Sequence, residues 1–428
     1  MNKDKSITCK YKYRCVTVTR GHLLIVPSKM SCRALAVMLA VVVSVCAFPR
    51  NGGDNRTATQ IIDKIISAGY PAELHHVTTE DGYILGVHRI PYGRNGPSEQ
   101  RRPVVFVMHG LMGSSANFIH VGSDYAIAYN LADAEFDVWL GNARGNTYSR
   151  AHVSLNPDDS QEKHDFFDFS WEEIGLIDLP TMIDYALAKT GESKLHYIGH
   201  SQGGTSFLVL NSMKPEYNEK FWSAHLLAGV GYMSNFPNTA LRTTALMTNS
   251  LYSLGTSLGL VEIRTLDDLP VSLTRQGYTY IDNCFGDVKY KAYCEMLGLE
   301  HIVGHSNSIS MIGGASLKQF AHYGQNIRDR IFRRWDYGLL TNRQVYGSIT
   351  PPSYNLGLVT VDVTMHYSVS DGLLDERDVL AMAADMPNTN ARKVERETFS
   401  HLDFIQSNDV RELVTNYIIY RLKLAERI

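Results

Sequence analysis

The stretch Leu195-His-Tyr-Ile-Gly-His-Ser-Gln-Gly203 is the most informative part of this chain. Its first four residues are typical of a short buried strand, and the residues from Gly203 to about Met213 are typical of a helix that opens with small side chains. A strand that turns sharply into a helix holds the residue at the turn in a strained backbone conformation, and flanking glycines prevent clashes there. The sequence therefore predicts that Ser201 sits on a nucleophile elbow.

A serine nucleophile needs an acid that orients its base, and in the α/β-hydrolase arrangement the chain order is Ser, then Asp or Glu, then His. The β-branched stretch from Val359 to Val369 predicts a strand, and the turn signal Ser370-Asp371-Gly372 follows it. Asp371 is therefore expected at the carboxyl end of a strand, where catalytic groups gather in open α/β sheets. The alternative is an ordinary turn aspartate. Asp375 and Asp378 are expected in the cap and first turn of a helix over 376–386.

The predicted base is His401, the one histidine that follows Asp371 in the chain. It stands between a strand expected over 393–397 and a closing helix expected over 409–421. Its position and the chain order single it out among the 16 histidines.

An oxyanion hole is predicted from the apolar strand Val104-Val-Phe-Val-Met, which runs into the loop His109-Gly-Leu-Met-Gly113. In this fold one oxyanion donor comes from such a loop and the other from the residue after the nucleophile. The expected donors are the backbone N–H groups of Leu111 and Gln202.

Beyond these motifs, the chain resembles the animal acid lipases, the group that contains gastric lipase and lysosomal acid lipase. The resemblance runs from about residue 58 to the end and rests on strings specific to that family: Gly69-Tyr-Pro-Ala-Glu, Thr79-Glu-Asp-Gly-Tyr-Ile-Leu, His109-Gly-Leu-Met, Leu131-Ala-Asp-Ala-Glu-Phe-Asp-Val-Trp-Leu-Gly-Asn-Ala-Arg-Gly-Asn, Phe167-Asp-Phe-Ser-Trp-Glu-Glu, Phe332-Arg-Arg-Trp-Asp-Tyr-Gly, Pro351-Pro-Ser-Tyr-Asn and Ser400-His-Leu-Asp-Phe.

The resemblance implies a lipase that cleaves triacylglycerols and cholesteryl esters, usually under mildly acidic conditions. Two departures from the family pattern stand out. Gly204 takes a position where the family often has threonine, and a smaller residue there is expected to be harmless. Tyr367-Ser-Val-Ser370 replaces glycine-rich sequence before Asp371, which makes this aspartate the least secure member of the triad by motif.

The amino end predicts an exported protein. Ala34 to Val45 form an apolar run preceded by Arg33, and Val45-Cys-Ala47 is a small-residue cleavage site, so residues 1–47 are interpreted as an upstream extension plus a signal peptide. The run is short for a membrane span, and no stable span is expected in the mature chain. A signal-anchor is the alternative. The expected destination is outside the cell, alternatively the lysosome.

The charge of the remaining chain argues against two classes of partner. Of 41 Lys and Arg and 44 Asp and Glu residues, eight basic and one acidic residue fall within 1–47, so the formal charge of the rest is about −10. Capture of nucleic acid or anionic membrane relies on basic patches, so neither is expected as a partner.

The cysteines also agree with export, because only Cys284 and Cys294 remain after the leader. In an oxidising compartment this pair is expected to form a disulfide worth about 2–3 kcal/mol. No second Cys or His pair stands nearby at ligand spacing, so no metal is expected, and no cofactor either. Asn55-Arg-Thr57 is the only glycosylation sequon.

The order of the elements predicts an α/β-hydrolase core with an inserted cap. Strands expected near 83–90, 104–109, 136–140 and 195–198 alternate with helices such as 179–189, which implies a mostly parallel sheet flanked by helices. The predicted organisation is core 48–235, a mainly helical cap or lid 236–354, and core 355–428. Apolar residues of the cap could face the active-site mouth or simply pack the cap onto the core: Met247, Leu251, Tyr252, Leu254, Leu258 and Leu260.

Together these features predict a serine lipase that cleaves neutral lipid esters at a lipid–water interface through an acyl-enzyme. Two alternatives remain open at this stage. One is a general carboxylesterase that acts on smaller esters. The other is a catalytically silent lipid-binding homologue, which would be expected to lose the nucleophile that this chain retains.

Overall fold

The computed structural model describes residues 16–19, 22–25, 59–264 and 313–426, which fall into two units. The smaller unit takes Met1–Gly53 and Leu266–Tyr278, and its described part is an antiparallel pair, β1 (Val16–Thr19) with β2 (His22–Ile25). The remaining described residues belong to the larger unit. The predicted signal peptide core, the sequon at Asn55 and the Cys284–Cys294 pair lie outside the described residues.

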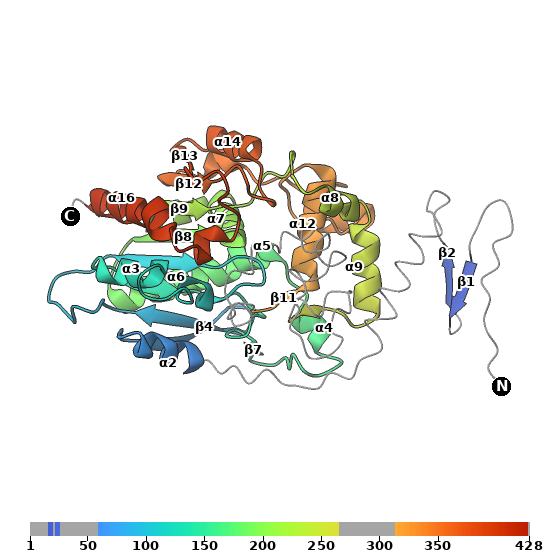
Figure 1. Cartoon of the computed structure of the whole chain (residues 1–428). Helices are drawn as coiled ribbons and strands as arrows, with labels where there is room; N and C mark the ends of the chain where they lie inside the picture. The colour runs from blue at the N-terminus through green and yellow to red at the C-terminus, as the bar shows by residue number, and fades with distance from the viewer. Residues whose placement is uncertain (1–15, 20–21, 26–58, 265–312, 427–428) are drawn as a thin grey trace, which may run out of the picture. The chain divides into compact units, whose positions relative to one another are not determined.

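The larger unit is built on a nine-stranded sheet in the order β13-β12-β9-β8-β5-β6-β4-β3, with β7 paired to β4 (Figure 1). The pairs from β13 to β6 are parallel, whereas β4 pairs antiparallel with β3, β6 and β7. The predicted, mostly parallel α/β sheet is thereby confirmed. Its strands are β3 (Glu73–Thr78), β4 (Tyr83–Ile90), β5 (Val104–Met108), β6 (Asp137–Leu140), β7 (Ala151–His152), β8 (Leu195–His200), β9 (Phe221–Leu227), β12 (Val363–Tyr367) and β13 (Thr389–Lys393).

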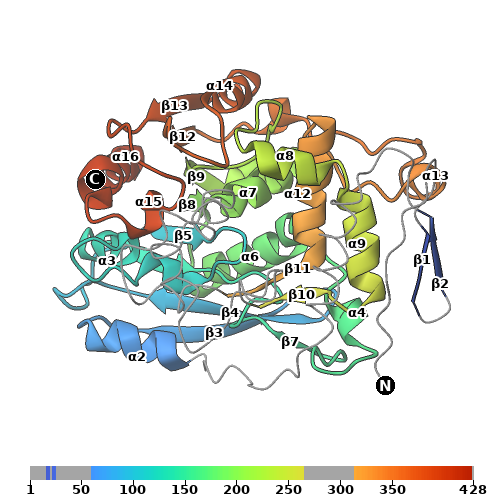
Figure 2. The ribbon, with the colours of Figure 1, turned by 45° about the vertical axis from the view of Figure 1, so that its right-hand side comes forward.

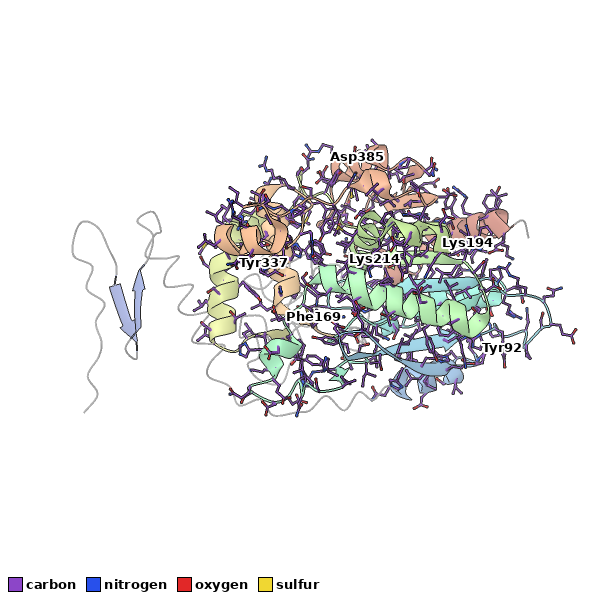
Figure 3. All side chains as sticks on the ribbon, turned by 180° about the vertical axis from the view of Figure 1, so that it is seen from behind. Tyr92, Phe169, Lys194, Lys214, Tyr337 and Asp385 are labelled. Atoms are coloured by element: carbon purple, nitrogen blue, oxygen red, sulfur yellow. The ribbon has the colours of Figure 1, made fainter. Side chains whose placement is uncertain are left out.

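The central strands are buried along their whole length because helices cover both faces of the sheet. Every residue of β5, β6, β8 and β12 is buried, as expected for parallel strands with helices on either side. Helices α3 (Ile127–Asp133) and α16 (Asn416–Glu426) cover one face, and α6 (Leu179–Thr190) and α7 (Gln202–Met213) cover the other (Figures 1 and 3).

Further helices complete the described part of the larger unit. They are α2 (Thr59–Ser67), α4 (Lys163–Phe166), α5 (Trp171–Glu173), α8 (Thr239–Ala245), α9 (Thr248–Ser257), α12 (Leu317–Asp329), α13 (Leu339–Tyr346), α14 (Glu376–Asp385) and α15 (Asp403–Gln406). Of the helices in the described ranges, none has both the length and the apolar character that crossing a membrane requires.

The interval 236–354, assigned to a cap from the sequence, contains α8, α9, α12 and α13 and the short pair β10 (Glu262–Ile263) with β11 (Ala315–Ser316). Helices α8 and α9 lie against α12, and α12 lies beside α7 (Figure 2). Residues 265–312 of this interval lie outside the described part of the chain.

One expected strand was wrong in its position. The last strand of the sheet is Thr389–Lys393, whereas the sequence predicted 393–397. None of the five residues of β13 is buried, because this strand is the outermost of the sheet and pairs only with β12. Without a buried face, its residues Thr-Asn-Ala-Arg-Lys carry no apolar pattern from which the strand could be recognised.

Candidate active site

Ser201 occupies the sharp turn between β8 and α7, with φ of 52° and ψ of −114°. Positive φ is uncommon for a residue with a side chain, so the strained elbow expected from the sequence is confirmed. Both neighbouring glycines are needed for space. A Cβ on Gly199 would lie 2.6 Å from the carbonyl carbon of Gly203, and a Cβ on Gly203 would lie 2.4 Å from the carbonyl oxygen of Met108.

Hydrogen bonds from two directions hold this strained residue in place. The Ser201 N–H donates to the carbonyl of Leu227 at the end of β9, over 2.9 Å. The Ser201 carbonyl accepts from the N–H groups of Gly204 (2.9 Å), Thr205 (3.2 Å) and Val230 (3.4 Å). A rarely populated backbone conformation persists when several hydrogen bonds from neighbouring elements fix it in this way.

Gly204, a departure from the resembled family, has a local structural reason in this chain. A Cβ at this position would lie 2.5 Å from the Cα of Gly229. The first turn of α7 therefore approaches the backbone after β9 more closely than any side chain at 204 would allow.

The structure brings Ser201, His401 and Asp371 into one hydrogen-bonded chain. Nε2 of His401 lies 2.8 Å from Oγ of Ser201, and Nδ1 of His401 lies 2.8 Å from Oδ2 of Asp371. The other carboxylate oxygen of Asp371 accepts from the N–H groups of Leu373 (2.8 Å) and Leu374 (3.0 Å), which fixes the orientation of the carboxylate. A base between a serine and a buried carboxylate is the arrangement required for activating the hydroxyl.

The neighbouring carboxylates have other partners. Asp375 caps α14 by accepting from the N–H of Arg377, as expected from the sequence. Asp378 is buried and accepts from the backbone N–H and the side-chain amide of Asn235, each over 2.8 Å.

The loop after β5 lies directly beside the elbow. A Cβ on Gly110 would be 2.9 Å from Cβ of Ser201. The loop closes as a turn in which the N–H of Gly113 donates to the carbonyl of Gly110 over 2.9 Å, with Met112 at φ of 59°. Within the described part of the chain, the backbone N–H groups of Leu111 and Gln202 have no hydrogen-bond acceptor. Both donors lie on backbone adjacent to the serine, because Gln202 follows it in the chain and Gly110, next to Leu111, packs against its Cβ. Their role as oxyanion donors stays a prediction.

Two buried histidines support the site, and sequence reasoning assigned neither a role. Nε2 of His200 lies 2.9 Å from the carbonyl oxygen of His401, and burial lowers the pKa of His200 to about 3. The ring is therefore neutral and donates through Nε2 to the loop that carries His401. His109 connects the turn at Gly110 to the N–H of Ala143, over 2.7 and 3.1 Å, and burial lowers its pKa to about 4. Their only sequence signal is adjacency to Ser201 and Gly110.

Substitution of His200 by glutamine, which keeps a side-chain N–H but does not titrate, is expected to make the free energy of unfolding less dependent on pH. The pKa of His200 is about 3 in the folded protein and near 6.5 in the unfolded chain. Below pH 6.5 the unfolded chain therefore takes up a proton that the folded protein does not, and stability falls as pH falls toward 3. Between pH 7 and pH 5 the wild type should lose about 2 kcal/mol more than the variant in urea unfolding. Parallel pH dependences would contradict a neutral buried His200.

No group of three or more His, Cys, Asp or Glu side chains suited to hold a metal ion occurs in the described ranges. The expectation that the chain needs neither metal nor cofactor stays a prediction. The chemistry that the described site offers is nucleophilic attack by an activated serine.

Comparison with known proteins finds lipases of the alpha/beta hydrolase fold. Residues 61–122 match a model of a partial alpha/beta-hydrolase lipase region, and residues 103–250 match a model of the alpha/beta hydrolase fold. The chain is 41% identical to Lipase 1 of Drosophila melanogaster, over 83% of this chain and 78% of that protein. It is 37% identical to Lipase 3 of the same organism, over 85% and 93%. It is 33% identical to human gastric triacylglycerol lipase, over 86% and 92%.

Proposed function

Because this chain belongs to the animal acid lipase family of α/β-hydrolases and is a carboxylic ester hydrolase, we propose that it is a serine lipase that cleaves neutral lipid esters through an acyl-enzyme on Ser201. The proposed substrates are triacylglycerols, cholesteryl esters or both. The observation that carries the proposal is the hydrogen-bonded chain from Asp371 through His401 to Ser201.

In the proposed reaction, Oγ of Ser201 attacks the ester carbonyl while Nε2 of His401 takes the hydroxyl proton. The oxyanion that forms accepts hydrogen bonds from the backbone N–H groups of Leu111 and Gln202. Collapse of the tetrahedral intermediate releases the alcohol, which receives the proton from His401. Water then attacks the acyl-enzyme by the same route and frees the acid. Asp371 holds the tautomer of His401 and stabilises the imidazolium.

Two observations favour a neutral lipid as substrate. Gastric triacylglycerol lipase of several mammals is among the relatives, and its name states its substrate. In addition, two leucines that flank α9 are exposed to solvent, Leu246 by 68% and Leu258 by 42%. Exposed apolar groups suit contact with long acyl chains better than contact with polar substrates. The acidic chain is poorly suited to an anionic surface.

The proposed destination is outside the cell, alternatively the lysosome, and it rests on the leader-like sequence of residues 1–47. The general carboxylesterase remains the alternative, whereas a catalytically silent homologue does not agree with membership of this enzyme family. A wild-type assay with emulsified triolein, emulsified cholesteryl oleate and a soluble short-chain ester distinguishes the lipase from the esterase, because an esterase favours the soluble substrate.

A double substitution of Leu254 and Leu258 by serine is expected to lower hydrolysis of emulsified triolein by at least tenfold, while hydrolysis of a soluble short-chain ester changes little. Leu254 is half-buried on α9 and Leu258 is exposed at its end, so serine there removes apolar surface that would meet an insoluble substrate. A leucine side chain that becomes buried against the lipid contributes about 1.5–3 kcal/mol of transfer free energy. Loss of part of this contribution from a single leucine is therefore enough to lower the rate tenfold. The rates are measured by titration of released acid.

The control is Leu424→Ser, the same leucine-to-serine change at an exposed position of α16. This helix belongs to the α/β-hydrolase part of the chain and not to the interval 236–354. It should leave the ratio of triolein to short-chain activity unchanged. Equal losses on both substrates in the α9 variant would mean that its leucines serve packing alone.

A further inference from the structure

The first turn of α12 contacts the residue that follows the nucleophile. Nε2 of Gln202 donates to Oε1 of Gln319 over 2.7 Å, and both side chains are 2% exposed. The two residues are 117 positions apart in the chain. Figure 2 shows α12 beside the start of α7, on the side where β8 ends. Oε1 of Gln202 has no hydrogen-bond partner among the described residues, so the contact with Gln319 is the polar anchor of this buried carboxamide.

The backbone N–H of Gln202 belongs to the same peptide unit as the carbonyl of Ser201. This unit is planar and trans, so its N–H points opposite to its C=O. Three N–H donors, from Gly204, Thr205 and Val230, fix the carbonyl. The direction of the Gln202 N–H therefore depends on two restraints: these bonds on one side and the anchored side chain of Gln202 on the other.

Helix α12 is attached firmly to the core by contacts that do not involve Gln202. The hydroxyl of Ser316 caps the helix and donates to the carbonyl of Phe169, a buried residue of the larger unit. Six residues further along, His322 stacks on Trp171 with ring centroids 3.7 Å apart. Side chains on such a fixed element can hold a reacting group within the narrow tolerance that catalysis demands.

A second contact joins α12 to α7. A third contact joins the residues just before α12 to the turn after β5. The hydroxyl of Tyr323 lies 2.8 Å from Oγ1 of Thr205, one turn along each helix. The N–H of Gly313 donates to the carbonyl of Met112 over 2.7 Å, in the turn that carries Leu111. The segment from Gly313 through Tyr323 therefore contacts both loops that bear the unused N–H groups.

We propose that Gln319 is a positioning residue for ester hydrolysis, whose side-chain carbonyl holds the Gln202 carboxamide and so fixes the Gln202 N–H against the developing oxyanion. This inference rests on the proposed function, since it assumes attack by Ser201 and an oxyanion at Gln202. It assigns to the interval 236–354, which contains α12, a role in the chemical step in addition to any role in admitting substrate.

Gln319→Leu tests the inference because leucine fills similar space but cannot accept the hydrogen bond. We expect kcat on a soluble short-chain ester to fall about tenfold to a hundredfold with KM little changed, since small displacements of an oxyanion donor cost rate rather than binding. The affinity for an alkylboronic acid, whose tetrahedral adduct with serine imitates the intermediate, should fall by the same factor.

The matched control is Gln325→Leu, the same change at a buried glutamine on the same helix. Gln325 donates to Asn249 and to the carbonyl of Asp336, away from the elbow. This variant reports any general loosening of α12 and should retain kcat and boronate affinity. Equal losses in both variants, wild-type kcat in Gln319→Leu, or a lower kcat with unchanged boronate affinity would each overturn the inference.

Gln319→Glu decides the question if the leucine variant does not fold. The introduced carboxyl keeps an acceptor for Gln202 but becomes negative as pH rises, and that charge opposes the oxyanion. Relative to wild type, kcat should be nearly normal at acidic pH and fall as pH rises. A ratio of variant kcat to wild-type kcat that stays constant with pH overturns the inference.

Ser201→Ala is measured alongside. If it retains hydrolysis the proposed function fails, whereas an inactive Ser201→Ala with a normal Gln319→Leu refutes the role of Gln319 alone.

Discussion

Ser201→Ala is expected to lower the rate of ester hydrolysis by roughly 10⁵–10⁶, because the members of a triad act as a unit and the nucleophile has no substitute. The variant should fold normally, since alanine has the smaller side chain and the bonds that fix the elbow come from the backbone at 201. The rate is measured on a soluble short-chain ester, which separates chemistry from access to an emulsion. An active-site phosphonate should label the wild type at Ser201 and leave the variant unlabelled.

Ser206→Ala is the matched control for this experiment. Ser206 lies on α7, five residues after the nucleophile, and is buried with no hydrogen-bond partner for its hydroxyl within the described residues. Its removal should change neither rate nor labelling. If Ser201→Ala keeps its activity or its label, the nucleophile lies elsewhere.

Asp371→Asn is expected to lower kcat by roughly 10⁴, because an amide in place of the carboxylate favours the wrong tautomer of the base and cannot stabilise the imidazolium. The carboxamide oxygen can still accept the N–H groups of Leu373 and Leu374, so the loop should keep its shape. The loss should therefore appear in kcat, with an unchanged melting temperature and a KM near that of the wild type. Steady-state kinetics and thermal unfolding on the same preparation check both expectations.

Asp375→Asn is the control, four residues further along the chain. Asp375 caps α14 and pairs with the exposed Arg377, and asparagine caps helices about as well as aspartate. Rate and stability should both remain close to those of the wild type. A nearly active Asp371→Asn together with an inactive Asp375→Asn would transfer the acid role to Asp375.

Local sequence signals were sufficient for the central strands and the elbow. Strands β5, β6 and β8 appear where the sequence predicts them, because parallel strands buried on both faces are rich in apolar residues. The antiparallel β4 also appears where predicted, and six of its eight residues are buried. The elbow at Ser201 was predictable because glycine is required at 199 and 203, where a Cβ would come within 2.6 Å of a neighbouring backbone atom. Chain order then selected Asp371 and His401, which the fold places within hydrogen-bond distance.

Tertiary structure decided what no local pattern encodes. The edge strand β13 has no buried face, so its position follows from pairing with β12 rather than from its own composition. Two hydrogen bonds join distant parts of the chain. His200 and the carbonyl of His401 are separated by 201 positions, and Gln202 and Gln319 are separated by 117 positions. A histidine or glutamine in the sequence reveals neither its burial nor its partner. The sequence alone therefore determined the candidate reacting groups, because short motifs and chain order were enough to select them. The folded chain alone determined what holds them in place, because such supports form only when distant segments pack together.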